Sequence, residues 1–178
     1  MIETYGSGFS HKAFDEKCRA SMHIRLADAV PVKAGAIELV SALRELDVPL
    51  AVAISSRSNH ALAHLRAAGV FDFFDTIVTR DDVTNPKPHP EPYLMAAERL
   101  KVDPLNCVAF EDSIAGVRAA HAAGMRTVMV PDLVVPGEEV TALCVAVLET
   151  LTHAHDHMIS GLRAANRSQL HLQVKSRG

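Results

Sequence analysis

Short apolar runs alternate along this chain with segments of helical periodicity, and this alternation constrains the fold more than any other feature of the sequence. The clearest run, Val48–Ile54, is continuously apolar, as expected of a strand buried on both faces. The other strand candidates are residues 75–79, 107–110 and 127–130, and the helical candidates are residues 10–29, 35–47, 61–68, 93–100, 113–123 and 140–158. The alternation predicts the α/β class: a Rossmann-like, mostly parallel sheet with helices on both faces.

Composition argues against several other classes of protein. The 178 residues carry 18 basic and 21 acidic side chains, and this small net charge gives no support for binding to nucleic acid. No apolar stretch approaches the ~20 residues of a membrane-spanning helix, and the first residues lack the basic and apolar regions of a secretory signal. The three cysteines are widely spaced, which suits reduced thiols. We therefore expect a soluble, cytoplasmic protein that does not bind membranes.

Polar residues follow three of the predicted strands, and parallel sheets bind ligands beyond the carboxyl ends of their strands. After the first strand, residues 55–59 (Ser-Ser-Arg-Ser-Asn) lead directly into a helix. Small hydroxyl groups and free N–H groups at a helix N-terminus can bind an anion. Serine and asparagine are also the commonest N-cap residues, so a simple capping turn is the alternative.

The second polar segment, residues 80–90, is rich in proline and places Lys87 between two of them. Because proline fixes φ, the loop would present this ammonium from a stiff backbone. A fixed ammonium can neutralise phosphoryl oxygens or a nearby carboxylate. A solvated surface lysine is the alternative.

The third polar segment, Glu111 and Asp112, places two adjacent acids between a strand and a helix. Carboxylates in this position suit a hard divalent cation such as Mg²⁺, which takes few protein oxygens. An aspartate N-cap beside a solvated glutamate is the alternative. Taken together, the hydroxyl groups, the lysine and the acidic pair predict one site that binds a phosphate and a magnesium ion.

Three segments resemble, in this order, the motifs of the haloacid dehalogenase-like hydrolases, in the subfamily of phosphoglycolate phosphatases and β-phosphoglucomutases. They are residues 48–59, 81–90 and 107–125, and the likeness covers nearly all of residues 30–132. The run Glu-Asp-Ser-Ile-Ala-Gly-Val at 111–117 is characteristic of the family. The resemblance implies a Mg²⁺-dependent hydrolase, a phosphatase acting on a small phosphorylated metabolite.

The resemblance also implies roles for single residues. Ser55 matches the hydroxyl that binds the transferring phosphoryl group, and Ser56 replaces it if the register is shifted by one. Lys87 matches the lysine that steadies the nucleophile and the phosphate charge. Asp112 matches the Mg²⁺ ligand, with Glu111 as a direct or water-mediated ligand beside it. Two further candidates for phosphate or substrate contacts are Arg57 and Asn59.

One motif of the family has no counterpart in the chain. The family's nucleophile and general acid/base are the two aspartates of an Asp-x-Asp-Gly motif on an earlier, central strand, and no Asp-x-Asp occurs here. Without that strand, the strands matching 50–54 and 107–111 would lose a ladder partner. The resemblance therefore divides the chain into the closing part of a helical cap (1–30), a core that lacks its first strand (31–158) and a basic tail (159–178). We hypothesise an incomplete or inactive form of the enzyme.

Alternatives remain for the function. A phosphomutase of the β-phosphoglucomutase type and a non-catalytic relative that binds a phosphate compound or a partner protein both fit the motifs, and the sequence leaves the substrate and the oligomeric state open. The histidine pairs 60/64 and 153/157 have helical spacing but no third ligand nearby, so we expect solvated surfaces there. We expect Cys107 to be a core residue rather than a nucleophile.

Overall fold

The structure is a computed structural model that describes residues 10, 13–14, 16–17 and 30–162. The chain divides into two units, Met1–Pro31 and Val32–Gly178. Most of the helix expected over residues 10–29 therefore lies outside the described residues, although residues 13–14 and 16–17 are helical. The predicted division into a cap remnant and a core stays a prediction. Among the described residues, none of the helices combines the length and the apolar character that a bilayer span requires.

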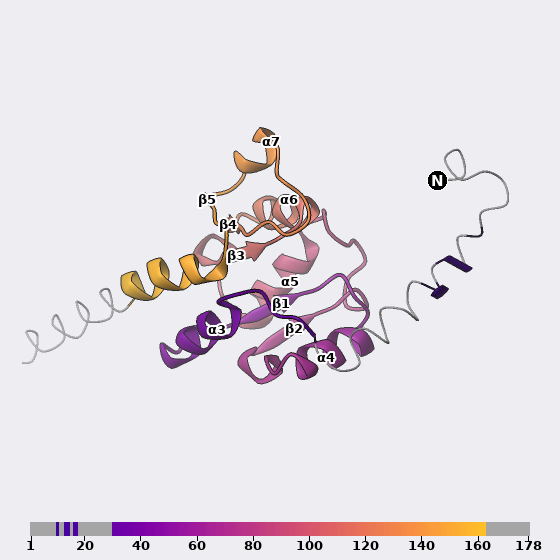
Figure 1. Ribbon diagram of the computed structural model, residues 1–178, viewed down its shortest axis with the longest axis horizontal. Coiled ribbons are helices and arrows are strands. Elements are labelled where there is room, and N and C mark those ends of the chain that lie inside the picture. Colours follow the sequence, from indigo (N-terminus) through magenta and orange to yellow (C-terminus); the bar gives the residue numbers. More distant parts are fainter. Residues whose placement is uncertain (1–9, 11–12, 15, 18–29, 163–178) are drawn as a thin grey trace, which may run out of the picture. The chain divides into compact units, whose positions relative to one another are not determined.

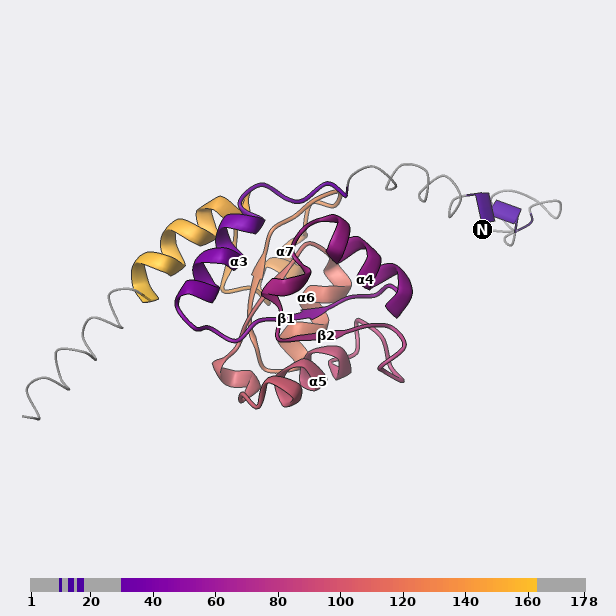
Figure 2. The same cartoon turned by 90° about the horizontal axis from the view of Figure 1, so that it is seen from below.

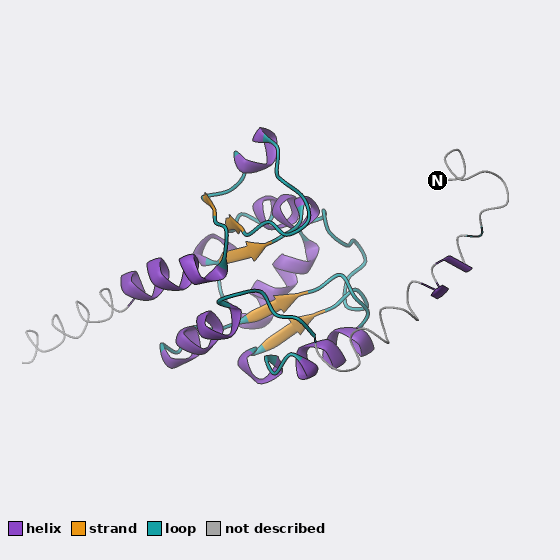
Figure 3. Cartoon of the chain, viewed as in Figure 1, coloured by secondary structure: helices purple, strands orange, loops and turns teal. Residues whose placement is uncertain are grey.

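The second unit alternates strands and helices, as the sequence predicts (Figures 1 and 3). Its strands are β1 (Ala51–Ala53), β2 (Thr76–Val78), β3 (Val108–Glu111), β4 (Arg126–Met129) and β5 (Ala146–Val147). All of the pairings are parallel. The strands form two sheets, one of order β1–β2 and one of order β3–β4–β5. The predicted α/β class with parallel strands is confirmed.

Most of the helices follow the predicted segments closely. They are α3 (Ala36–Glu45), α4 (Ser58–Ala67), α5 (Glu91–Leu100), α6 (Ile114–Ala122) and the short α7 (Glu138–Thr141), and residues 151–162 form a C-terminal helix. Gly69 and Gly124, which follow α4 and α6, have φ angles of 68° and 83°. This left-handed conformation ends a helix at little cost when the residue is glycine.

The stretch 140–158, which we expect to be mostly helical with an unclear start, is helical only in part. The structure places α7, the strand β5 and the start of the C-terminal helix in this stretch. β5 pairs with β4, where Val128 lies opposite Ala146. A short apolar run has no periodicity that separates a strand from a helix, so the edge of β4 decides its conformation. The C-terminal helix also continues past 158, and Ile159, which we assigned to the tail, is buried at 3% exposure.

Helices cover the strands on both faces, and Figure 2 shows α3 and α5 on opposite sides of β1 and β2. On one side, residues of α5 and α6 such as Tyr93 and Ala120 pack with Ala53 and Cys107 of the strand region. On the other side, the buried face of α3 packs with the C-terminal helix and with Phe110 of β3. Both faces of the strands are therefore apolar and covered.

The edges of β1 and β3 that face away from their partners carry no ladder within the described residues. The carbonyl of Leu50 and the N–H of Ile54 bond to the β2 side. Because backbone groups alternate along a strand, those of Ala51 and Ala53 point to the opposite edge. On β3 the carbonyls of residues 107 and 111 bond to the β4 side, so the backbone groups of Val108 and Phe110 point to the free edge.

Candidate active site

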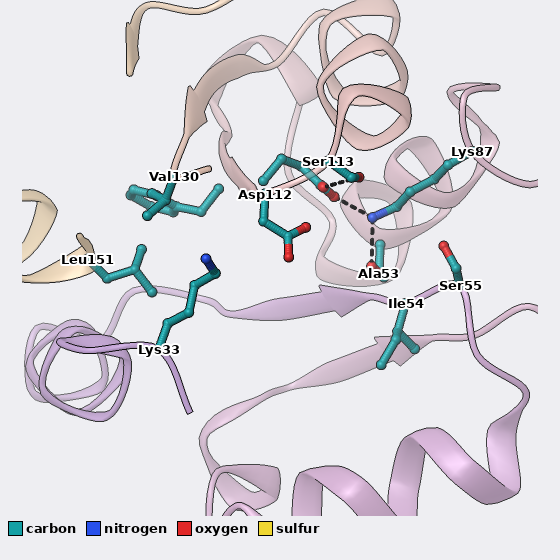
Figure 4. Close-up of a pocket in the computed structure, with 11 residues that line it drawn as sticks. Lys33, Ala53, Ile54, Ser55, Lys87, Asp112, Ser113, Val130 and Leu151 are labelled. Carbon is teal, nitrogen blue, oxygen red and sulfur yellow. Dashed lines mark hydrogen bonds and ion pairs between the residues drawn. The ribbon is translucent and has the colours of Figure 1, made fainter. Parts of the chain in front are cut away.

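A cavity of about 310 Å³ lies at the carboxyl ends of β1, β3 and β4 (Figure 4). Its lining consists of Lys33, Ala53, Ile54, Ser55, Lys87, Phe110, Glu111, Asp112, Ser113, Val130 and Leu151. Three of the predicted polar segments, far apart in the sequence, therefore contribute to one cavity. The position agrees with the rule that ligands of parallel sheets bind beyond the carboxyl ends of the strands.

Lys87 connects the two sheets at this cavity. Its ammonium donates to the carbonyl oxygen of Ala53 on β1 at 3.0 Å and forms an ion pair with Oε1 of Glu111 on β3 (Figure 4). The side chains of Lys87 and Glu111 are 10% and 7% exposed. The alternative of a solvated surface lysine is therefore wrong, because this ammonium is largely buried and paired.

The loop that carries Lys87 is held by Glu91, at the start of α5. The carboxylate of Glu91 accepts hydrogen bonds from the backbone N–H groups of Thr84 and Asn85 at 2.8 and 2.9 Å, and these bonds lower the pKa of its carboxyl. The carboxylate thus ties the beginning of the loop to the helix at its end. The loop is anchored by this bonding as well as by its prolines.

Glu111 is the most heavily bonded acid of the cavity. Besides the ion pair with Lys87, its Oε1 accepts from the hydroxyl of Tyr93, and its Oε2 accepts from Oγ of Ser113 at 3.1 Å. Gly116 of α6 lies directly against this carboxylate, where a Cβ atom would come within 1.8 Å of Oε2. Burial, and then the negative charge of Glu111, raise the pKa of Tyr93, so its hydroxyl stays a donor.

Asp112, in contrast, is exposed and lines the cavity with a carboxylate that points into it (Figure 4). No group of three or more acidic, histidine or cysteine side chains that could hold a metal ion occurs among the described residues. Mg²⁺ needs only one or two protein carboxylates, because it keeps several waters and takes phosphate oxygens. The donor set therefore fits a Mg²⁺ ion held through Asp112, whereas both oxygens of Glu111 already accept hydrogen bonds.

The residues predicted after β1 separate in the structure. Ser55 lines the cavity, but Ser56, Arg57 and Asn59 are not part of the lining. The chain turns into α4 at this point, and the side chain of Asn59 accepts a hydrogen bond from the N–H of the next residue. At the start of α4, where the sequence predicts an anion-binding site, the backbone N–H of Ser58 donates to the carboxylate of Asp81. An acidic side chain of the protein therefore takes the position that an anionic ligand would occupy.

Three lining or supporting residues were not predicted from the sequence. Lys33 lies opposite Lys87 in the cavity and is held by the carbonyl oxygen of Pro131 and by Asp132, both at 3.3 Å. Ser113 is the N-cap of α6, and the capping pattern before a helix could have identified it. Tyr93 resembles an ordinary core aromatic residue, and no sequence signal separates it from one.

The other residues considered from the sequence lie away from this cavity. The imidazoles of His60 and His64 are 6.4 Å apart between ring centroids and do not line it. Burial raises the pKa of the Cys107 thiol, followed by the charge of Asp103, so the thiolate is disfavoured. This agrees with the expected role of Cys107 in the core.

Comparison with known proteins identifies the family of the chain. The family model of the haloacid dehalogenase-like hydrolases matches residues 4–124. The YhcW protein of Bacillus subtilis is 37% identical over 134 residues, which cover 75% of this chain and 60% of YhcW. The phosphorylated carbohydrates phosphatase of Thermotoga maritima is 35% identical over 120 residues, 67% of this chain and 53% of that enzyme. The chain thus spans less than two thirds of the length of these relatives.

A solved structure shows the same fold. CbbY from Rhodobacter sphaeroides, in complex with phosphate, superposes with a TM-score of 0.63 and 31% identity, covering 67% of this chain and 54% of CbbY. The matched family model extends over more than half of the sequence and includes the lysine and acidic segments around the cavity. The chain therefore belongs to the haloacid dehalogenase-like hydrolases.

Proposed function

We propose that the cavity binds the phosphoryl group of a small phosphorylated metabolite, and that the chain supplies the phosphate- and Mg²⁺-binding groups of a phosphatase. The observation that carries this proposal is the convergence of Ser55, Lys87 and Asp112 on one cavity at the carboxyl ends of parallel strands. A hydroxyl donor, a buried ammonium and a free carboxylate are the groups that a phosphoryl ester with a divalent cation requires.

Each group has a distinct role in this proposal. Lys87 neutralises the charge of the non-bridging phosphoryl oxygens, and its fixed position means that little reorganisation is needed when a ligand binds. The hydroxyl of Ser55 donates a hydrogen bond to one of these oxygens. Asp112 holds the cation, which when bound neutralises further phosphoryl charge. Arg57 and Asn59 do not line the cavity and have no role in the proposed site.

We further propose that turnover requires a strand that the described residues do not provide. Within the described part of the chain, the carboxylates that line the cavity are Glu111 and Asp112. Both oxygens of Glu111 accept hydrogen bonds from neighbouring side chains, and Asp112 is assigned to the cation, so neither is left to act as a nucleophile. The free edges of β1 and β3 both border the cavity, and a parallel strand between them could carry a third carboxylate to Lys87.

Phosphate binding is the first test. Titration of the chain with inorganic phosphate in the presence of Mg²⁺, followed by calorimetry, should show saturable binding that Lys87→Met and Ser55→Ala weaken. The matched control is Lys101→Met, because Lys101 is an exposed lysine at the far end of α5. Equal weakening by the control and by Lys87→Met would show that the binding is non-specific attraction to positive charge.

Phosphate release is the second test. We expect little Mg²⁺-dependent release from sugar phosphates by this chain, and release by a form extended at its N-terminus with a strand that carries the Asp-x-Asp-Gly motif. Equal turnover by both forms would contradict the need for a further strand. Conversion of a sugar 1-phosphate to the 6-phosphate would identify a phosphomutase instead. Phosphate binding without turnover in either form would favour a non-catalytic relative.

A further inference from the structure

Tyr93 is a buried residue of α5 that touches both members of the ion pair at the cavity. Its hydroxyl donates to Oε1 of Glu111, and the ammonium of Lys87 lies 4.8 Å from the centroid of its ring. We propose that Tyr93 is a positioning residue, which sets the direction in which the Lys87 ammonium faces the cavity. The inference rests on the proposed function, because it concerns how this ammonium meets a phosphoryl group.

The bonding of Lys87 shows why its direction depends on Glu111. An ammonium carries three N–H donors. One donates to the carbonyl oxygen of Ala53 and a second donates to Glu111. Because two of the N–H groups point at these acceptors, tetrahedral geometry leaves only one direction for the third N–H group. Lys87 lines the cavity, so this third N–H group is available to a ligand there. The carbonyl of Ala53 is fixed by β1, whereas the Glu111 side chain has rotatable bonds and must itself be held.

Tyr93 is well placed to hold Glu111. It binds Oε1, the same oxygen that pairs with Lys87, while Ser113 binds only Oε2. Tyr93 is 7% exposed and packs among alanines of α5 and α6, so its hydroxyl has little freedom to move. Its ring also attracts the ammonium through a cation–π contact. The hydroxyl therefore fixes the carboxylate and the ring supports the lysine.

These two contacts can be separated by mutation. Tyr93→Phe keeps the ring under Lys87 and removes only the hydroxyl that holds Glu111. Ala96→Gly is the matched control for lost stability, because Ala96 is a buried residue of the same helix that packs with Val78 and Val83 instead. Glycine in place of alanine in a helix costs about 0.5–1 kcal/mol, so the control destabilises the fold without touching the ion pair.

The first measurement needs no ligand. The ¹H–¹⁵N signal of the Lys87 ammonium should be visible in the wild-type chain at low temperature, because bonding to two acceptors slows hydrogen exchange. We expect this signal to broaden or disappear in Tyr93→Phe and to persist in Ala96→Gly. An unchanged Lys87 signal in Tyr93→Phe would overturn the positioning role, whether or not the chain binds phosphate.

The second measurement connects the role to the proposed function. Binding of inorganic phosphate should weaken about tenfold in Tyr93→Phe, the scale of one lost hydrogen bond to a charged group, and remain near the wild-type affinity in Ala96→Gly. Full wild-type affinity in Tyr93→Phe would overturn the inference and leave the proposed function standing. If the wild-type chain binds no phosphate, the proposed function fails, and the ammonium signal still decides whether Tyr93 positions Lys87.

Discussion

Gly116→Ala tests the packing behind the candidate site more directly than any other single substitution. A Cβ atom at this position would lie 1.8 Å from Oε2, 2.0 Å from Cδ and 2.5 Å from Oε1 of Glu111. Heavy atoms in contact are normally about 3.5 Å apart, so the carboxylate has to move by more than an atomic radius. The movement breaks its bonds to Lys87 and Tyr93.

The magnitude follows from three effects. Overpacking of a tight interior site costs about 1–3 kcal/mol, and disruption of a buried ion pair costs about 3–5 kcal/mol when one charge is left unpaired. The higher helix propensity of alanine stabilises the folded state by about 1 kcal/mol relative to glycine and offsets part of this cost. Because the displaced carboxylate can partly reach solvent, we expect the free energy of unfolding to fall by about 2–4 kcal/mol.

Urea unfolding followed by circular dichroism measures this change as a lower midpoint with an unchanged slope. Gly137→Ala is the matched control, since Gly137 has φ −76° and an added Cβ there would meet no atom within 4 Å; its effect should stay within about 0.5 kcal/mol. In a Glu111→Ala background the added methyl meets no carboxylate, so most of its cost should vanish. A Gly116→Ala chain as stable as the wild type would refute the close approach of Glu111.

Three further predictions concern other parts of the molecule. Gly35→Ala should destabilise the fold by more than about 3 kcal/mol in thermal unfolding. Gly35 has φ 83°, and a Cβ atom there would lie 2.2 Å from the backbone of the C-terminal helix. The control Gly69→Ala should cost only about 1 kcal/mol, because Gly69 has a similar φ of 68° but open space around an added Cβ atom. Hydrogen bonding to Arg99 lowers the pKa of Asp82 from 3.8 to about 2. The ionised carboxylate of Asp82 therefore stabilises the fold fully above pH 3.8, and this stabilisation is lost as the pH falls through 2. The difference in unfolding free energy between the wild type and Asp82→Asn should therefore be full at pH 7 and vanish near pH 2, and a constant difference would contradict the ion pair. Asp112→Asn should abolish Mg²⁺ binding measured by calorimetry without a change in thermal stability, because Asp112 is exposed; unchanged Mg²⁺ affinity would place the cation elsewhere.

Much of the fold could be predicted because its signals are local. The apolar run before Ser55 and the helical periodicity that follows it need no knowledge of distant residues. The same holds for the glycines that end α4 and α6, whose positive φ angles follow from steric freedom at a single residue. The strand β5 within the stretch 140–158 was not predicted, because the edge of β4, a distant partner, determines that these residues become a strand.

The candidate site likewise has a part that could be predicted from the sequence and a part that could not. The sequence alone placed Ser55, Lys87 and Asp112 at the ends of strands, since a polar segment after a buried strand is visible in the order of residues. The residues alone make Glu111 and Asp112 equivalent neighbouring acids, and only the family resemblance gave Asp112 the role of Mg²⁺ ligand with Glu111 beside it. Only the tertiary structure separates their surroundings, because Glu111 is the last residue of β3 and is buried, whereas Asp112 lies just after the strand and is exposed.

One of these two acids is buried against Gly116, Tyr93 and Lys87, and the other faces the cavity. The contacts of Tyr93 were likewise invisible in the sequence, because the helix that carries it meets Glu111 only once the chain has folded. Motif order thus determined which segments form the site. Burial and hydrogen-bond geometry, which depend on packing between distant segments, decided what each side chain in it can do.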